Sequence, residues 1–504
     1  VTVGDNRFAG DSLTLTYAGA SFADKNVGTG KAVSVSGIAI SGGADAGNYT
    51  LGGTTASTTA NISQLASVAW TGGSTGNWSN AANWAGGAIP DLSNVAAVTI
   101  GSGTTVTYDA GVAGTTNLTS LSDAGTFQMA GGALTVSGAM ATAGFGQTGG
   151  TLSAGTLTVS ALGAINKTGG TLIASLLNIT SVGGASFAGN NFVSSFQATN
   201  SGSGGVGLTN GSSGSPTPLA VLGISNPVGA VMIDNIGAVT TTGAITAGTT
   251  VDIVAHSPLT IGSGGIMAGG NISLAAGGGA TVTTADVLTL LGPVTSTGGG
   301  IDLYAGWTLV QNANVTTSGG IINAFADAGA IVMANSAVTS SNGGAITYDA
   351  GKNFVVSSLN SGSGPMFVNV GGILSSAPGF GGTNFVGDSL TLAAFDTTGF
   401  TSQVRVLSVD IANESFTPTV TIADPVVNSV VDSLNDATGV SSDDSVLPPV
   451  IKVMGGASGD SQDMTTGGGE GTFGDEKDDG KEGGNKTSPK KEETKQSRRV
   501  SSCS

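Results

Sequence analysis

One short pattern recurs along the chain as Gly131-Gly-Ala-Leu134, Gly149-Gly-Thr-Leu152 and Gly169-Gly-Thr-Leu172. A similar double glycine before an apolar residue returns at Gly299, Gly319 and Gly343. Each copy is a double-glycine turn followed by a short apolar strand. One such unit cannot bury its apolar side chains alone, so successive units must stack and share a core. A period of about 20 residues with strands and Gly/Asn turns therefore predicts a β-solenoid.

The repeated pattern extends over residues 95–394, for which we predict a right-handed parallel β-helix in an all-β protein. Inward positions should be Leu, Ile, Val and Ala, and outward positions Thr, Ser and Asn. With a strand spacing of about 4.8 Å, roughly 15 coils would give a rod of roughly 70 Å. Residues 200–227 break the pattern with a Gly-Ser run and two prolines near Pro216, which predicts a loop excursion from the rod.

The composition of the chain excludes several classes of protein. Its 504 residues include 86 Gly, one His and one Cys, and the net charge is −17. A strongly acidic chain does not suit nucleic acid, because neutralising phosphates requires a basic surface. One His and one Cys exclude an internal disulfide framework and the common multi-ligand zinc sites, so we expect no cofactor. No apolar run approaches about 20 residues, so we expect no transmembrane helix.

Residues 1–63 differ from the rest of the chain, because short segments of alternating apolar and polar residues are separated there by Gly, Asp and Asn turns. This pattern predicts a small antiparallel β domain. Two strings within it are unusually specific, Phe22-Ala-Asp-Lys-Asn-Val-Gly-Thr-Gly-Lys31 and Ser41-Gly-Gly-Ala-Asp-Ala-Gly-Asn-Tyr-Thr-Leu51. They resemble the YDG repeat domain of large bacterial surface proteins of the filamentous haemagglutinin type.

Residues 64–94 form a Trp-rich linker or cap, because three of the four tryptophans, Trp70, Trp78 and Trp84, are clustered there. The string resembles a segment that precedes β-helical regions in secreted bacterial adhesins and autotransporter passengers. One interpretation is an aromatic cap over the exposed end of the solenoid core, which terminal repeats need. The other is a platform on which sugar rings stack. The cap is the interpretation we favour, since large aromatic side chains contribute most to stability when they are buried.

The C-terminal part of the chain divides into two segments. Residues 395–440 should hold terminal strands such as Gln403–Ile411 and a short capping helix over residues 425–434, on which four apolar side chains share a face. Residues 441–504 form a charged tail with few apolar groups, which predicts disorder. Its Cys503 is a candidate intermolecular tether, although an incidental exposed thiol is the favoured alternative.

Motifs typical of catalysis are present only in weak form. Gly72-Gly-Ser74-Thr-Gly76 matches the nucleophile-elbow pattern and 202–207 matches G-x-G-x-x-G, but neither is followed by residues that would form a helix. The lone His256 is better explained as a turn or surface residue than as a base or a ligand.

Paired carboxylates remain the one route to a polysaccharide-cutting enzyme, since hydrolysis needs two of them facing each other. Residues one coil apart stack in a solenoid, so Asp286 could approach Asp302, and Asp327 could approach Asp349. Isolated Asp residues that cap turns are the favoured alternative. We therefore expect that the chain is not an enzyme.

The resemblance to filamentous haemagglutinin-like proteins implies a C-terminal part of an exoprotein exported by two-partner secretion. Its partner would be an outer-membrane transporter, its location the bacterial cell surface, and its role attachment through a long β-helical fibre. The receptor, whether glycan or protein, cannot be inferred from the sequence. Three alternatives are kept: a spacer without direct receptor binding, a β-helix polysaccharide hydrolase or lyase, and a carrier of a contact-dependent toxin. The last would require a compact C-terminal toxin domain, which the Gly/Lys/Glu tail does not offer.

Overall fold

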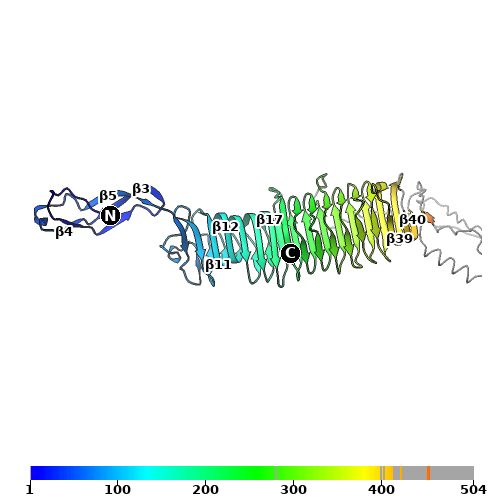
Figure 1. Cartoon of the computed structure of the whole chain (residues 1–504), viewed down its shortest axis with the longest axis horizontal. Coiled ribbons are helices and arrows are strands. Elements are labelled where there is room, and N and C mark those ends of the chain that lie inside the picture. Colours follow the sequence, from blue (N-terminus) through cyan, green and yellow to red (C-terminus); the bar gives the residue numbers. More distant parts are fainter. Residues whose placement is uncertain are drawn as a thin grey trace, which may run out of the picture. The chain divides into compact units, whose positions relative to one another are not determined.

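The protein is described by a computed structural model, which covers residues 2–277, 281–397, 400, 403–411, 421–422 and 451–453. Of these described residues 57% lie in strands and 2% in helices, so the fold is all-β, and its main body is a parallel β-solenoid of about 14 turns (Figure 1). At about 4.8 Å per turn the solenoid is roughly 65 Å long. The predicted fold class is therefore confirmed.

Small antiparallel sheets precede the solenoid. In one of them β1 (Thr14–Thr16) pairs with β4 (Ala39–Gly42). In the other, β3 (Gly28–Ser36) lies between β2 (Gly19–Phe22) and β5 (Thr55–Ile62). The 3₁₀ turn η1 (Ala46–Asn48) follows β4.

The solenoid strands stack in register on three faces. The first face is built by β7 (Thr75–Asn77), β9 (Thr105–Tyr108), β14 (Ile165–Lys167), β16 (Ala185–Phe187), β18 (Val206–Asn210), β20 (Val231–Asn235), β23 (Val251–Ala255), β26 (Ile272–Ala276), β29 (Ile301–Ala305), β32 (Ile322–Ala326) and β35 (Ile346–Ala350). The second face contains β21 (Val239–Thr241), β24 (Leu259–Ile261), β27 (Leu288–Leu290), β30 (Leu309–Gln311), β33 (Ile331–Met333) and β36 (Phe354–Val356). The third contains β22 (Ile245–Ala247), β25 (Ile266–Ala268), β28 (Val294–Ser296), β31 (Val315–Thr317), β34 (Val338–Ser340) and β37 (Ser358–Asn360).

Longer strands complete the ladder near its two ends. They are β11 (Ser120–Met129), β12 (Ala133–Gln147), β13 (Thr151–Ser160), β15 (Thr171–Ser181), β17 (Asn190–Asn200), β19 (Leu219–Asn226), β38 (Pro365–Ser376), β39 (Thr383–Asp396) and β40 (Gln403–Ile411). The remaining elements are β6 (Leu65–Ala69), η2 (Ala81–Asn83), β8 (Val95–Ile100), β10 (Thr115–Leu118), β41 (Thr421–Ile422) and β42 (Ile451–Val453).

The recurring Gly-Gly-x-Leu pattern marks one corner of the solenoid. Leu134, Leu152 and Leu172 are register partners in successive coils, so the pattern stacks on itself. The corner needs glycine for two reasons. Gly170 has a φ of +67°, which side chains rarely adopt, and a Cβ on Gly169 would lie 2.3 Å from the carbonyl oxygen of Thr148 in the coil before. Close coil-to-coil approach at the corner thus explains the spacing that the sequence repeats.

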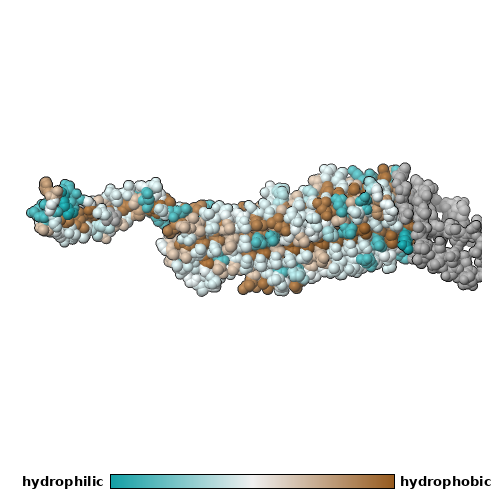
Figure 2. Space-filling view, in the orientation of Figure 1, coloured by the Kyte–Doolittle hydropathy of each residue, from teal (hydrophilic) through white to brown (hydrophobic). Residues whose placement is uncertain are grey.

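The core is a set of inward columns that run along the solenoid. Leu208, Ile233, Ile253, Leu274 and Leu303 are successive partners in one column of the first face, and all are at most 1% exposed. A parallel column holds only alanine over five coils, and its buried members are Ala255, Ala276, Ala305, Ala326 and Ala350. The outer surface has wide pale areas in hydropathy colouring, where Ser, Thr and Gly cover it, interrupted by brown patches of exposed apolar side chains such as Met232 and Met267 (Figure 2). This inward and outward division confirms the prediction.

Buried amides occupy some corner positions and bond the coils to one another. Asn200 is fully buried, and its Nδ2 donates to Oδ1 of Asn226 at 2.9 Å in the next coil. The same amide donates to the carbonyl oxygens of Gly202, Ser203 and Gly204, each at 3.1 Å. Each of these corner carbonyls would be costly to leave buried without a donor.

We expect Asn200→Ala to lower the free energy of unfolding by about 2 kcal/mol, because it leaves corner carbonyls and the Asn226 amide short of a partner. Urea unfolding followed by far-UV circular dichroism measures the change. Thr199→Ala, at the neighbouring outward position, is the matched control and should change the midpoint little. An equal loss of stability in both variants would contradict the assignment of this role to the buried amide.

Two predicted boundaries are wrong. Residues 200–227 are not a loop excursion, because β18 and β19 lie within the ladder and only 211–218 connect them. The Gly-Ser run of this segment forms a tight corner rather than a loop, since Gly202 and Gly204 pack directly on the coil before. Residues 64–94 are not outside the solenoid either, because β6 and β7 pair in parallel with β8 and β9.

At the C-terminal end, the predicted strand Gln403–Ile411 is present as β40 and continues the parallel ladder from β39. The predicted capping helix over residues 425–434 and the charged tail over residues 441–504 lie outside the described residues, apart from β42. In the ranges that the structure describes, no helix has both the length and the hydropathy of a membrane span.

Candidate functional site

The three clustered tryptophans form one pile at the N-terminal end of an inward column. Trp78 follows β7 and lies against Tyr108, with ring centroids 5.4 Å apart. Trp84 packs on Trp78 at 4.5 Å, and Trp70 packs edge-on against Trp84 at 5.0 Å. The pile also contacts Phe127, whose ring centroid is 6.2 Å from that of Trp78. These contacts put the tryptophans where the core of the first coil would otherwise be open.

Burial separates the two interpretations of this cluster. Trp78 is 0% exposed and Trp84 is 2% exposed, so neither offers a ring face on which a sugar could stack. Nε1 of Trp84 donates to the carbonyl oxygen of Trp78 at 2.9 Å, and Nε1 of Trp70 donates to that of Gly73 at 2.9 Å. Trp70 is half-buried. The geometry favours a cap for this pile.

The proposed carboxylate pairs are not stacked. Asp302 lies between Ser273 and Asn323 in the register, and it accepts a hydrogen bond from Nδ2 of Asn323 at 2.7 Å. Asp286 is instead buried in the connection between β26 and β27, where Oδ2 accepts from the backbone N–H of Thr283 at 2.7 Å.

The second pair fails in the same way. Asp349 is the register partner of Phe325 rather than of Asp327, which follows the end of β32. Asp349 accepts a hydrogen bond from Nδ2 of Asn369 at 3.0 Å. Neither predicted pair is therefore formed by the stacking of one coil on the next.

The lone histidine lies at a bend just after β23. Nε2 of His256 is 3.0 Å from Oδ1 of Asp234, and both side chains are partly exposed. Burial raises the pKa of nearby Asp252, a hydrogen bond from Ser273 lowers it, and the charge of Asp234 raises it. In the described part of the chain, no three His, Cys, Asp or Glu side chains come together as a group that could hold a metal ion.

The two weak motifs lie at ordinary structural positions. Ser74 directly precedes β7 and is exposed. The glycines of 202–207 form a corner that leads into the strand β18 rather than into a helix. Cys503 lies outside the described residues.

Sequence reasoning missed a buried lysine. Lys167 is 0% exposed in the inward column between Gln147 and Phe187, and its Nζ donates to the carbonyl oxygens of Gly170 and Ala188, both at 3.0 Å. Burial lowers the pKa of Lys167 to about 8. Its place in the alternating pattern of β14 was a signal, since Ile165 and Lys167 share one side of that strand.

Sequence reasoning also missed a surface that we name the aromatic corner. It consists of Tyr304, Trp307, Phe325, Asp327 and Lys352, where the first face ends and the second begins. Nζ of Lys352 lies 4.3 Å from the centre of the Trp307 ring. Aligning the sequence coil by coil would have brought Tyr304 and Phe325 together.

The specific strings of the N-terminal domain have a structural explanation. Tyr49 donates its hydroxyl to Oδ2 of Asp11 at 2.6 Å, and Oδ2 of Asp45 accepts from the backbone N–H of Ser12 at 2.9 Å. A Cβ on Gly43, which has a φ of +118°, would lie 2.3 Å from the carbonyl oxygen of Ser12. These residues fasten the segment before β1 to the domain.

Comparison with known proteins agrees with this part of the sequence. Residues 1–60 match the family model of the YDG domain, so the chain contains a YDG domain followed by a parallel β-solenoid. The match does not extend to the solenoid. No curated protein matches the chain, and no solved structure matches it.

Proposed function

We propose that this chain is a segment of a secreted bacterial surface fibre that mediates attachment to cells or to a matrix. The observation that carries the proposal is the unbroken parallel ladder of about 14 turns behind a YDG domain, which makes an extended protein with a long repeated surface. In this proposal the fibre lies outside the bacterial cell and reaches it through an outer-membrane transporter of two-partner secretion. The resemblance to filamentous haemagglutinin-like proteins supports both points.

The main alternative within the same architecture is a stalk that only sets the distance of another binding domain from the cell. Insertions and aromatic residues gathered at one edge of the solenoid favour direct binding over a plain stalk.

We also propose that the chain is not an enzyme. This is supported by the register, which pairs Asp302 and Asp349 with amides in the next coil instead of with a second carboxylate.

Attachment by the producing bacterium tests the proposal. Residues 95–394 are replaced, in the full-length protein, by an unrelated β-solenoid with the same number of coils, and surface display is checked with an antibody. We expect attachment to fall at least about tenfold, because the coils that carry the binding surface are gone while the length is kept. Unchanged attachment with normal display would count for the stalk and against the adhesin.

A further inference from the structure

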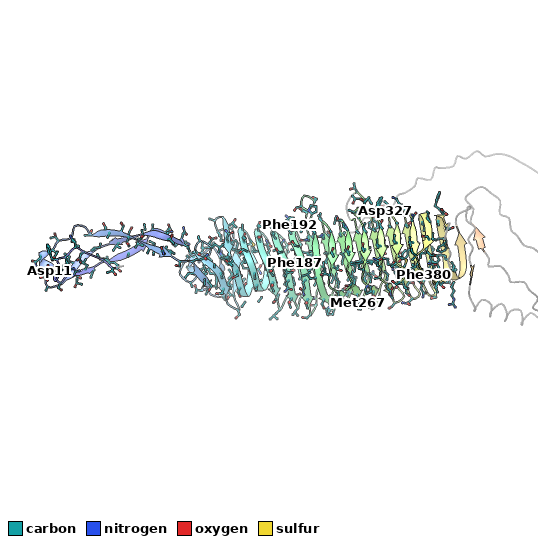
Figure 3. The ribbon with its side chains drawn as sticks, turned by 45° about the horizontal axis from the view of Figure 1, so that its top comes forward. Asp11, Phe187, Phe192, Met267, Asp327 and Phe380 are labelled. Carbon is teal, nitrogen blue, oxygen red and sulfur yellow. The ribbon has the colours of Figure 1, made fainter. Side chains whose placement is uncertain are left out.

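Insertions into the solenoid gather at one edge. The connection from the first to the second face has three residues at 256–258, 306–308 and 351–353. It has eight residues at 211–218, and eleven between β26 and β27. Figures 1 and 3 show loops projecting from the upper edge of the solenoid, and Asp327 lies at this edge. In repeat proteins, insertions that map to one side often mark the binding side.

Aromatic side chains appear on the outside of the first face next to the longer insertion. Tyr304 and Phe325 are register partners one coil apart, and both are half-buried. The equivalent outward position is Asp234, Val254, Ala275, Asp349 or Asn369 in five other coils. Trp307 follows Tyr304 closely in the same coil and is half-buried as well. Three aromatic side chains thus lie within two coils, whereas the other exposed large apolar side chains of the first face, Met232 and Phe367, lie in other coils.

Polar groups that both donate and accept hydrogen bonds flank these aromatic rings. Asp302 is bonded to Asn323 on one side, and Asp349 is bonded to Asn369 on the other. Burial raises the pKa of the Tyr304 hydroxyl, and the charges of Asp327 and Asp286 raise it further. The backbone of Asp286 is fixed beside Trp307, because the carbonyl oxygen of Asp286 accepts a hydrogen bond from the backbone N–H of Trp307 at 2.8 Å.

The net negative charge of this surface limits the class of ligand that it can bind. The aromatic corner and its flanks carry Asp302, Asp327 and Asp349 against Lys352, so a sulfated or carboxylated polymer would be repelled. A basic peptide is disfavoured at the Trp307 ring, because the charge of Lys352, whose Nζ lies 4.3 Å from the ring centre, would repel a second cation, whereas it does not repel an uncharged ligand. Carboxylate–amide pairs remain free to accept from and donate to hydroxyl groups, and aromatic rings bind the apolar C–H face of a sugar ring.

We propose that the aromatic corner is a binding site for an uncharged oligosaccharide that lies along the axis of the solenoid. Coils repeat at about 4.8 Å, which is close to the length of one sugar unit in an extended chain. Tyr304 and Trp307, which belong to one coil, would contact one sugar ring, and Phe325 in the next coil would contact the next ring, with Asp302, Asn323 and Asp349 bonding the hydroxyl groups. The inference deepens the proposed adhesin function, on which it rests, by naming the ligand class and the residues.

Binding is measured by isothermal titration of the purified full chain with neutral hexasaccharides: cellohexaose, laminarihexaose, mannohexaose and N-acetylated chitohexaose. We expect at least one of them to bind, and Trp307→Ala and Tyr304→Ala each to weaken it about tenfold. Met267→Ala is the matched control, because Met267 is 53% exposed and lies at the opposite edge in Figure 3. Circular dichroism melting confirms that each variant folds.

Two results would overturn the inference: no neutral hexasaccharide binds at millimolar concentration, or binding survives both aromatic substitutions. The attachment experiment and this binding experiment test the two proposals separately, so that either proposal can be wrong while the other stands. If replacing residues 95–394 leaves attachment unchanged while the purified chain binds a hexasaccharide through Trp307, the adhesin proposal is wrong and the oligosaccharide site stands. If attachment falls but no hexasaccharide binds, the reverse holds.

Discussion

Replacing Trp78 with alanine will lower the free energy of unfolding of the N-terminal coils by about 3–5 kcal/mol. The side chain is fully buried and contacts Trp84, Tyr108 and Phe127, so its removal leaves a large cavity at the end of the core. Because each coil of a solenoid is stabilised by its neighbours, the loss should concentrate in the first coils. Hydrogen exchange with mass spectrometry should show faster exchange in β6 to β9 and little change beyond β20.

Two control variants separate capping from a general effect of losing an aromatic residue. Trp78→Phe keeps most of the ring and removes Nε1, which has no partner among the described residues, so we expect a much smaller loss. Phe367→Ala removes a 44% exposed ring from the first face and should change stability by less than about 1 kcal/mol. Uniformly faster exchange along the whole solenoid in Trp78→Ala would contradict the cap.

Raising the pH will stabilise the solenoid through Lys167. Its pKa is about 8 in the folded chain against an ordinary 10.5, because burial disfavours the charged form. Below pH 8 both states bind the proton, and the buried charge reduces stability by a constant amount. Between pH 8 and 10.5 the unfolded chain binds more protons than the folded one, so the free energy of unfolding rises. The full rise is about 3 kcal/mol.

The measurement is the urea midpoint between pH 7.5 and 9.5, below the range in which tyrosines ordinarily titrate. Lys167→Met keeps an unbranched chain in the same column without an ionisable group, so its midpoint should be flat over this range. The difference between the two proteins isolates the lysine from any other group that titrates. A rise of equal slope in Lys167→Met would show that another residue is responsible.

The repeat itself was predictable from residue spacing. Leu134, Leu152 and Leu172 stack as their Gly-Gly-x-Leu pattern indicates, since a corner that needs glycine recurs once per coil. Side-chain direction followed from alternation, because inward and outward positions differ in every strand of the first face. The YDG domain was recognisable because two strings of the sequence resemble a known family, and the structure shows that Asp45 and Tyr49 in the second string bond to Ser12 and Asp11.

The candidate site was less predictable, because coil length varies. Asp286 and Asp302 belong to the same coil, since the coil that ends at Asp302 begins at its register partner Ser273. The eleven-residue connection between β26 and β27 makes this coil longer than its neighbours. Asp327 misses Asp349 by two positions, because the register partner of Asp349 is Phe325. This shift of two positions places Asp327 in the turn after β32 instead of beside Asp349. The average spacing of the repeat was therefore not accurate enough to identify outward neighbours in successive coils.

The stacking of short coils has a mechanical consequence for a chain held at both ends. Each coil is joined to the next by backbone bonds parallel to the axis, by the packing of inward apolar side chains and by a few buried amides such as Asn200. Under tension, an end coil can peel away while the others stay intact. A coil such as that from Ile301 to Ile322 would release roughly 70 Å of extended chain for the loss of about 5 Å of rod. We therefore expect the solenoid to lengthen many-fold before it breaks, and so to absorb sudden pulling forces.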